Sequence, residues 1–238
     1  MKNIVCSAAL LAATSGALAA DFNAQRTGFT GTGGITVTDG SSVVHAVSGG
    51  HIEFTYGVGG SPAAGAAGQF VGPAGSSFNT FCIELDQGAS TAMKPYDIVD
   101  LASAPNPAAG GANPNAPSAY GSAIATNIRK VVASAIALGW INADLSATVL
   151  TTNARLAAIQ GEIWKAIYGN VSYSSNSEVA TLVTRVNGGL DGSHVAGLRA
   201  MVSSSAQDQL YVVPLPPAAF AGLATLVGIA GVSRIRRR

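Results

Sequence analysis

The sequence predicts an α+β fold in which a β-rich N-terminal half precedes a helical half within one domain. In the first half, short β-branched and aromatic runs alternate with Gly-containing turns, which is typical of hairpin strands. In the second half, apolar residues recur at helical spacing. Strands grouped before helices favour an α+β arrangement over an alternating one. The body, residues 20–211, is long enough to bury its own core, and an apolar segment flanks it at each end.

Turn and cap residues set the expected boundaries. Asp39-Gly40 and Gly49-Gly50 separate the first three runs and predict two hairpin turns. Gly139 and Gly169 each follow a helical pattern, where glycine commonly ends a helix. The predicted strands are residues 35–38, 43–47, 52–56, 78–85, 96–101 and 210–213. The predicted helices are residues 119–138, 153–168, 177–186 and 195–203, and residues 102–118 form a long irregular connection.

Charge and composition exclude some classes of function. Residues 20–213 carry 12 Asp and Glu side chains against 8 Lys and Arg, a formal net charge of −4. Such an acidic body lacks the basic surface that neutralises phosphates, so we expect no nucleic-acid partner. Few charged residues among many Gly, Ala, Ser and Thr suit an extracellular protein.

The residue types that carry most enzyme chemistry form no convincing group. His45 and His51 lie in predicted strands near Glu53, and two histidines without a third matching ligand predict solvated side chains rather than a metal site. Glu84 and Asp86 alternate with apolar residues, which predicts a solvated strand face. We therefore expect no enzyme activity, no catalytic residue, no metal and no cofactor.

The N-terminus has the order of a secretory signal peptide. Lys2 precedes an apolar run at residues 4–13, and Ala17 and Ala19 give the A-x-A spacing of a cleavage site. We expect residues 1–19 to be removed by signal peptidase, and Cys6 with them. Cys82 would then be the one cysteine of an exported protein.

Two short segments surround Cys82 and Gln160: Phe81-Cys82-Ile83 and Ile159-Gln160-Gly161-Glu162-Ile163-Trp164. They resemble the signature pieces of bacterial thioester domains, which are modules of surface adhesins, and the resemblance covers residues 78–168. It implies that the Cys82 sulfur and the Gln160 side-chain carbonyl join as an internal thioester, which amines or hydroxyls at a surface can attack. Gly161 and Glu162 stand where the family has small or apolar residues. Two other interpretations of Cys82 remain open: an inert core residue and an intermolecular disulfide.

The C-terminus, residues 212–238, contains an apolar run at residues 218–232. As a helix this run would rise about 22 Å, which is short for a hydrocarbon core of about 30 Å. A proline motif precedes the run and a basic cluster follows it: Val213, Pro214, Leu215, Pro216 and Pro217, then Arg234, Arg236, Arg237 and Arg238. These three parts in this order resemble the PEP-CTERM sorting signal of bacteria in its VPLPA-type variant. Terminal arginines place that end in the cytoplasm.

The sorting signal implies a membrane protease of the exosortase type as a partner and delivery to the cell surface or biofilm matrix. The helix would stay in the inner membrane only until cleavage. Together the motifs predict a surface adhesin with a thioester as one function. The alternative is a structural matrix protein or non-covalent exopolysaccharide-binding module with an inert core cysteine.

Overall fold

The computed structural model describes residues 22–38, 44–57, 72–105, 118–174, 176–190, 195 and 197–213. The predicted signal peptide and the predicted apolar tail helix lie outside these ranges. Of the helices that the structure describes, none has the length and apolarity that crossing a membrane requires. The described residues form one α+β domain, as the sequence predicts.

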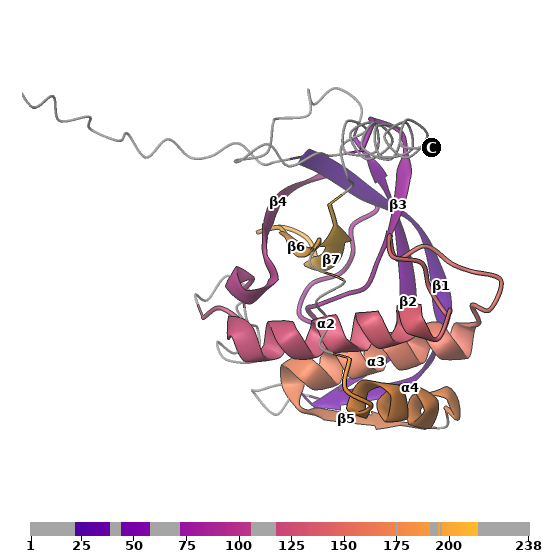
Figure 1. Cartoon of the computed structure of the whole chain (residues 1–238). Coiled ribbons are helices and arrows are strands. Elements are labelled where there is room, and N and C mark those ends of the chain that lie inside the picture. The colour runs from indigo at the N-terminus through magenta and orange to yellow at the C-terminus, as the bar shows by residue number, and fades with distance from the viewer. Residues whose placement is uncertain are drawn as a thin grey trace, which may run out of the picture.

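Seven strands and three α-helices make up this domain. Figure 1 shows the helices gathered at one end of the molecule, with β1 and β2 rising from them. The strands are β1 (Phe22–Thr38), β2 (Val44–Tyr56), β3 (Ser77–Thr80), β4 (Lys94–Asp100), β5 (Asn170–Tyr173), β6 (Leu198–Val202) and β7 (Gln209–Val212). The helices are α2 (Gly121–Ala137), α3 (Asn153–Tyr168) and α4 (Glu178–Asn187), with a short 3-10 turn, η1, at Leu101–Ser103.

The sheet is antiparallel, and its two ends meet. Its order is β3-β2-β1-β4-β6-β7, with β5 on the far part of β1. Two residues beyond β3, Cys82 forms an antiparallel bridge with Gln209, the first residue of β7. Because β3 and β7 stand at opposite ends of the strand order, this bridge closes the sheet on itself at the cysteine.

The first hairpin is confirmed, but the predicted second turn is wrong. β1 and β2 pair up to Thr38 and Val44, around the predicted Asp39-Gly40 turn, which lies outside the described residues. Gly49 and Gly50 instead lie buried inside the continuous strand β2. A Cβ on Gly49 would press on the backbone of Ala157 in α3. A Cβ on Gly50 would press on the backbone of Thr30 and Gly31 in β1. Gly49 therefore allows close helix–sheet contact and Gly50 close contact between β1 and β2, and neither reverses the chain.

Helix α3 is buried along most of its length. Thr152 caps its N-terminus by accepting the Arg155 N–H, and Gly169 ends it with a φ of 77°. Its residues Ile159 and Ile163 pack into the apolar cluster shared with α2, while Trp164 packs into a second cluster among the strands. Because α3 lies between these two apolar clusters, its polar residues Gln160 and Glu162 are buried as well.

The predicted fourth helix, residues 195–203, is a strand. Its residues 198–202 form β6, which pairs with β4 on one side and β7 on the other. A short apolar run cannot distinguish a strand from a buried helix segment by its spacing, and here two neighbouring strands supply the hydrogen bonds. The helices predicted at 119–138, 153–168 and 177–186 are confirmed with small shifts of their ends.

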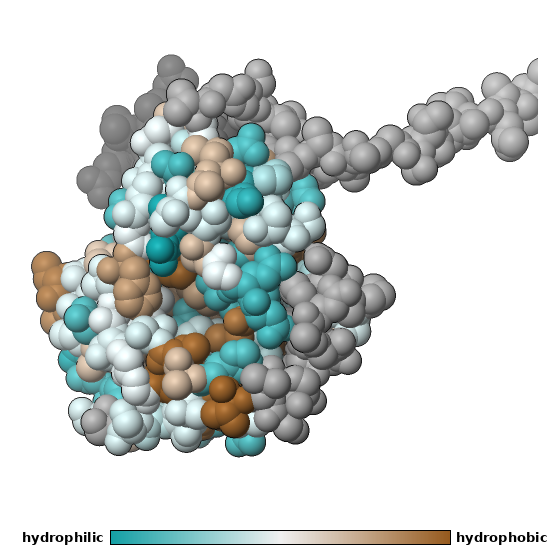
Figure 2. All heavy atoms as spheres, turned by 180° about the vertical axis from the view of Figure 1, so that it is seen from behind, coloured by the Kyte–Doolittle hydropathy of each residue, from teal (hydrophilic) through white to brown (hydrophobic). Residues whose placement is uncertain are grey.

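Much of the apolar surface is dispersed. Figure 2 shows that the apolar side chains drawn in colour on the rear face form small groups among hydrophilic ones. The large apolar side chains that are exposed come from several separate elements and loops: Phe29, Val44, Met93, Val149 and Leu150. Single exposed apolar residues of this kind are normal for a protein surface.

Candidate functional site

Cys82 lies where the sheet closes, opposite Gln209. The backbone N–H of Leu210 donates to Phe81 O (2.8 Å), and that of Ile83 donates to Asp208 O (3.1 Å). These bonds flank the Cys82–Gln209 pair, so it is a non-hydrogen-bonded pair, the geometry in which cross-strand side chains come closest. The main-chain N–H and C=O of Cys82 consequently point away from β7.

Gln160 occupies the other side of the Cys82 backbone. The Cys82 N–H donates to Gln160 Oε1 (2.8 Å), and Gln160 Nε2 donates to Cys82 O (2.7 Å). The carboxamide thus replaces the neighbouring strand that Cys82 lacks on this side. The structure brings Cys82 and Gln160 together, as the sequence predicts. Gln160 is hydrogen-bonded to the main chain of Cys82. The Cys82 sulfur forms its contacts with other side chains.

The sulfur contacts two glutamines that the sequence analysis missed. Cys82 Sγ donates to Gln207 Oε1 (2.9 Å), and Gln209 Nε2 lies 3.7 Å from Sγ. Gln209 Nε2 also donates to Gln207 Oε1 (3.0 Å), so the three side chains form one group. The available signal was the alternation Gln207-Asp208-Gln209 directly before the predicted closing strand at residues 210–213, which puts both amides on one face if the strand begins earlier.

Neighbouring groups fix the orientation of both amides. Gln207 Nε2 donates to Glu84 O (2.7 Å), which turns its oxygen toward the sulfur. Thr80 Oγ1 donates to Gln209 Oε1 (3.1 Å), which turns the nitrogen of Gln209 toward Gln207. Because each amide has a defined partner at both ends, the carbonyl carbons are held in place beside the thiol.

Cys82 itself is a protected, neutral thiol. It is a free cysteine, and its side chain is buried. Burial raises the pKa of the Cys82 thiol to about 12. Since the thiolate is the form that reacts with alkylating agents and disulfides, this environment suppresses both reactions.

Two buried acids lie next to this group, and the prediction that Glu84 is solvated is wrong. Glu84 is fully buried, and its Oε2 accepts the N–H of Asp208 (3.1 Å). Burial raises the pKa of Glu84 to about 7. Burial also raises the pKa of Asp208 to about 8, and the nearby Glu84 adds to the shift. Asp86, the other carboxylate of the predicted face, is exposed.

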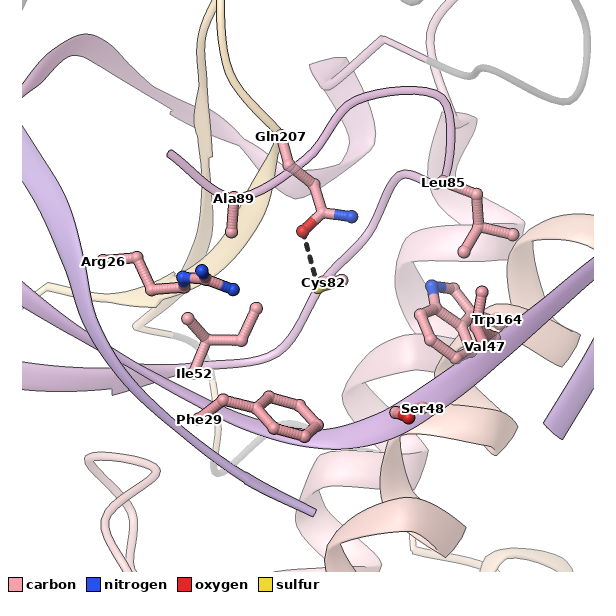
Figure 3. A pocket seen from close by; sticks show the side chains of 10 residues that line it. All are labelled: Arg26, Phe29, Val47, Ser48, Ile52, Cys82, Leu85, Ala89, Trp164 and Gln207. Carbon is pink, nitrogen blue, oxygen red and sulfur yellow. Dashed lines mark hydrogen bonds between the residues drawn. The ribbon is translucent and has the colours of Figure 1, made fainter. Parts of the chain in front are cut away.

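A pocket of about 380 Å³ reaches Cys82 from the surface. In Figure 3, Gln207 and Cys82 face each other across a dashed hydrogen bond, with Arg26 on one side and Trp164 on the other. The other residues that line the pocket are Phe29, Val47, Ser48, Ile52, Leu85 and Ala89. A small molecule entering here would meet the sulfur at the inner end of the pocket.

The remaining predicted motif residues form the support of the site. Phe81, Ile83, Ile159 and Ile163 are fully buried core residues. Trp164 is 2% exposed and lines the pocket.

The two motif positions that depart from the family have a local explanation. A Cβ at Gly161 would overlap the ring of Tyr173, whose hydroxyl donates to Glu162 Oε1 (2.9 Å). Gly161 therefore makes room for Tyr173, and Glu162 holds it.

The histidines behave differently from one another. His51 is 4% exposed and packs against the Phe81 ring, so the prediction of a solvated side chain is wrong for it. Burial lowers the pKa of His51 to about 4. His45 is partly buried, and His194 lies outside the described residues.

Comparison of the chain with protein-family models, with curated proteins and with solved structures finds no match. Of the predicted sorting motif, only Val213 is described, where its N–H donates to Gly197 O (3.3 Å). Pro214, Leu215, Pro216, Pro217 and the terminal arginines lie outside the described residues.

Proposed function

We propose that the protein is an exported surface adhesin in which Cys82 and Gln209 form an internal thioester. The observation that carries the proposal is the closely approaching, non-hydrogen-bonded Cys82–Gln209 pair, with its buried sulfur between two oriented carboxamides. An internal thioester is an electrophile that a surface amine or hydroxyl can open, leaving the protein covalently attached.

The geometry favours Gln209 over Gln160 as the acyl donor. Both polar atoms of the Gln160 side chain are bonded to the Cys82 main chain, so moving its carbonyl carbon to the sulfur would leave two buried main-chain groups unpaired. Gln209 stands on the side-chain face of Cys82, with its Nε2 3.7 Å from Sγ. In this proposal Gln160 is a positioning residue that fixes the strand.

The reaction balances without any added reagent. The sulfur bonds to Cδ of Gln209, the C–N bond breaks, and the thiol proton leaves with the nitrogen as ammonia. Gln207 Oε1 contacts both the thiol and Gln209 Nε2, so it lies on the path of that proton. Thr80 Oγ1 donates to the oxygen on which negative charge develops during the attack.

Burial explains how such a bond would survive. Water reaches the sulfur poorly, because Cys82 is 7% exposed and Gln209 is fully buried. A nucleophile would have to enter through the Cys82 pocket, which gives the site a measure of selectivity. A second cysteine nearby would compete for the thiol, and Cys82 is the one cysteine of the body.

The test is the intact mass of the purified protein. We expect a mass lower by one ammonia than its sequence requires, resistance of Cys82 to alkylation after unfolding without reductant, and a gain of one methylamine on incubation with that amine. Cys82→Ala should abolish the mass loss and the amine gain. Full sequence mass together with complete alkylation of Cys82 would contradict the thioester.

That second outcome would favour the other candidate function, a non-covalent module for matrix polysaccharide. The observation behind this alternative is the open pocket beside a thiol that is neutral and hydrogen-bonded as it stands. In that case polysaccharide binding would persist in Cys82→Ala, whereas covalent capture would not.

We further propose that the terminal segments deliver this module. Signal peptidase would remove residues 1–19, and an exosortase-type protease would recognise Val213-Pro214-Leu215-Pro216 and remove the apolar helix with Arg234, Arg236, Arg237 and Arg238. Sequencing both ends of surface-extracted protein tests this. Material that begins at Met1 or ends only at Arg238 would contradict it.

A further inference from the structure

The pocket beside Cys82 contains two hydrogen-bond donors, on Trp164 and Arg26, for which the described part of the chain shows no side-chain partner. Trp164 is 2% exposed, and its Nε1 has no hydrogen-bond partner in the described part of the chain. The Arg26 guanidinium forms no ion pair with a carboxylate of any described residue. In Figure 3 the Arg26 guanidinium and the Trp164 ring nitrogen lie on opposite sides of the pocket and both point toward its middle.

An unpartnered buried indole N–H is costly, so its position indicates a ligand atom that accepts a hydrogen bond. The Trp164 indole N–H and the Arg26 guanidinium can only donate hydrogen bonds, and the guanidinium carries a permanent positive charge. The rest of the wall is largely apolar, from Phe29, Ile52 and Leu85 among others. A small group that fits these features is planar, negatively charged and made of acceptor oxygens, and a guanidinium binds a carboxylate in this way.

We propose that this pocket binds the carboxylate of the molecule that the protein captures, so that the acceptor is an amine or hydroxyl compound carrying a nearby carboxylate. The inference rests on the proposed thioester for its covalent step. In that step the nucleophile bonds to Cδ of Gln209, the bond from Cδ to Cys82 Sγ breaks, and the proton of the nucleophile passes to Sγ. Acceptors of this class include amino acids and acidic sugars.

The first test compares acceptors of similar size on the full-length chain. The rate of opening is measured by mass for β-alanine, propylamine and 2-aminoethyl phosphate, each corrected for its unprotonated fraction. We expect β-alanine to react about fivefold faster than propylamine, the ratio that one partly exposed ion pair provides. Equal rates for β-alanine and propylamine would overturn the proposal. A faster reaction of 2-aminoethyl phosphate than of β-alanine would also overturn it and would indicate a phosphate site instead.

Arg26→Gln should bring the ratio of β-alanine to propylamine rates close to one. The matched control is Arg185→Gln, which removes an exposed arginine of α4 that does not line this pocket. The ratio should keep its wild-type value in Arg185→Gln. A ratio that is the same in Arg26→Gln and wild type would overturn the role of Arg26.

The second test does not depend on the thioester. In full-length Cys82→Ala, which cannot form that bond, propionate should shift the indole N–H resonance of Trp164 and propylamine should not. Trp140 is the only other tryptophan, so Trp140→Phe assigns the signal. No propionate shift would overturn the carboxylate site even if the mass test supports the thioester. A clear shift with no mass loss would retain the site and overturn the proposed function alone.

Discussion

The two sides of Cys82 show how differently one type of side chain can act on the same residue. On the α3 side, Gln160 binds the main chain of Cys82 through both of its polar atoms. On the β7 side, Gln207 and Gln209 surround the sulfur, with Oε1 of Gln207 2.9 Å from Sγ. One side thus holds the strand in position, and the other presents acyl carbons to the thiol. Contact with a cysteine therefore does not by itself identify the reaction partner of its sulfur.

The largest expected effect comes from Gln209→Ala. Without the carboxamide, the proposed acyl donor is gone, so loss of ammonia and uptake of methylamine should both fall to zero. Intact mass before and after methylamine treatment measures this, with circular dichroism to show that the variant folds. Methylamine uptake that persists in folded Gln209→Ala would contradict the proposal that Gln209 is the acyl donor and Gln160 the positioning residue.

Gln160→Ala should act mainly on stability. It leaves the buried N–H and C=O of Cys82 without partners, which costs about 1–3 kcal/mol for each group. We expect the free energy of unfolding to drop by about 2–6 kcal/mol, measured by urea denaturation. Gln25→Ala, in the partly exposed part of β1, is the control and should change stability little. A stable Gln160→Ala variant would deny its positioning role.

The buried acids beside Gln207 predict the pH dependence of stability. Since the folded-state pKa of Glu84 is raised to about 7, the folded protein binds more protons than the unfolded chain between about pH 4.5 and 7. Stability attributable to Glu84 is therefore fully present below that window and is lost as the pH rises through it.

Glu84→Gln should remove this loss, which is roughly 3 kcal/mol across the window. Urea denaturation at several pH values compares the variant with wild type, so that the opposite contribution of His51 cancels. An equally steep decline in both proteins would show that Glu84 does not titrate as described.

A smaller effect is expected from Gly161→Ala. The added methyl group would overlap the Tyr173 ring and push it from α3, at a cost of about 1–3 kcal/mol. Gly88→Ala is the matched control, because nothing lies within 4 Å of its Cβ position. Thermal unfolding of the two variants should separate them, and Tyr173→Ala should relieve the clash in Gly161→Ala. Equal melting temperatures for the two glycine variants would remove this explanation of Gly161.

Sequence patterns within one segment predict the helices, whose hydrogen bonds form within that same segment. The helices at 153–168 and 119–138 follow from apolar spacing and from glycines at their ends, and the structure confirms them. Residues 195–203 were predicted as a helix because their apolar spacing suits either state; only pairing with β4 and β7 makes them a strand. The burial of Gly49 likewise depends on α3, which lies far along the sequence.

The candidate site was predictable in part for the same reason. Cys82 and Gln160 belong to short motifs, so the sequence brings them to attention and the structure places them in contact. Gln209 has no comparable motif in the sequence analysis, because its role depends on the register in which β7 meets the chain beyond β3. That register is a long-range property, and hydrophobic alternation along one strand does not determine the partner of that strand.

The most direct test of the difference between the two sides of Cys82 is the position of methylamine after the proposed thioester is opened. Gln160 and Gln209 fall in different tryptic peptides, since Lys165 lies between them. Gln207 and Gln209 share a tryptic peptide, and fragmentation between them shows which of the two carries methylamine. We predict methylamine on Gln209 and none on Gln160 or Gln207. Methylamine on Gln160 or Gln207, or on no glutamine at all, would contradict the assignment.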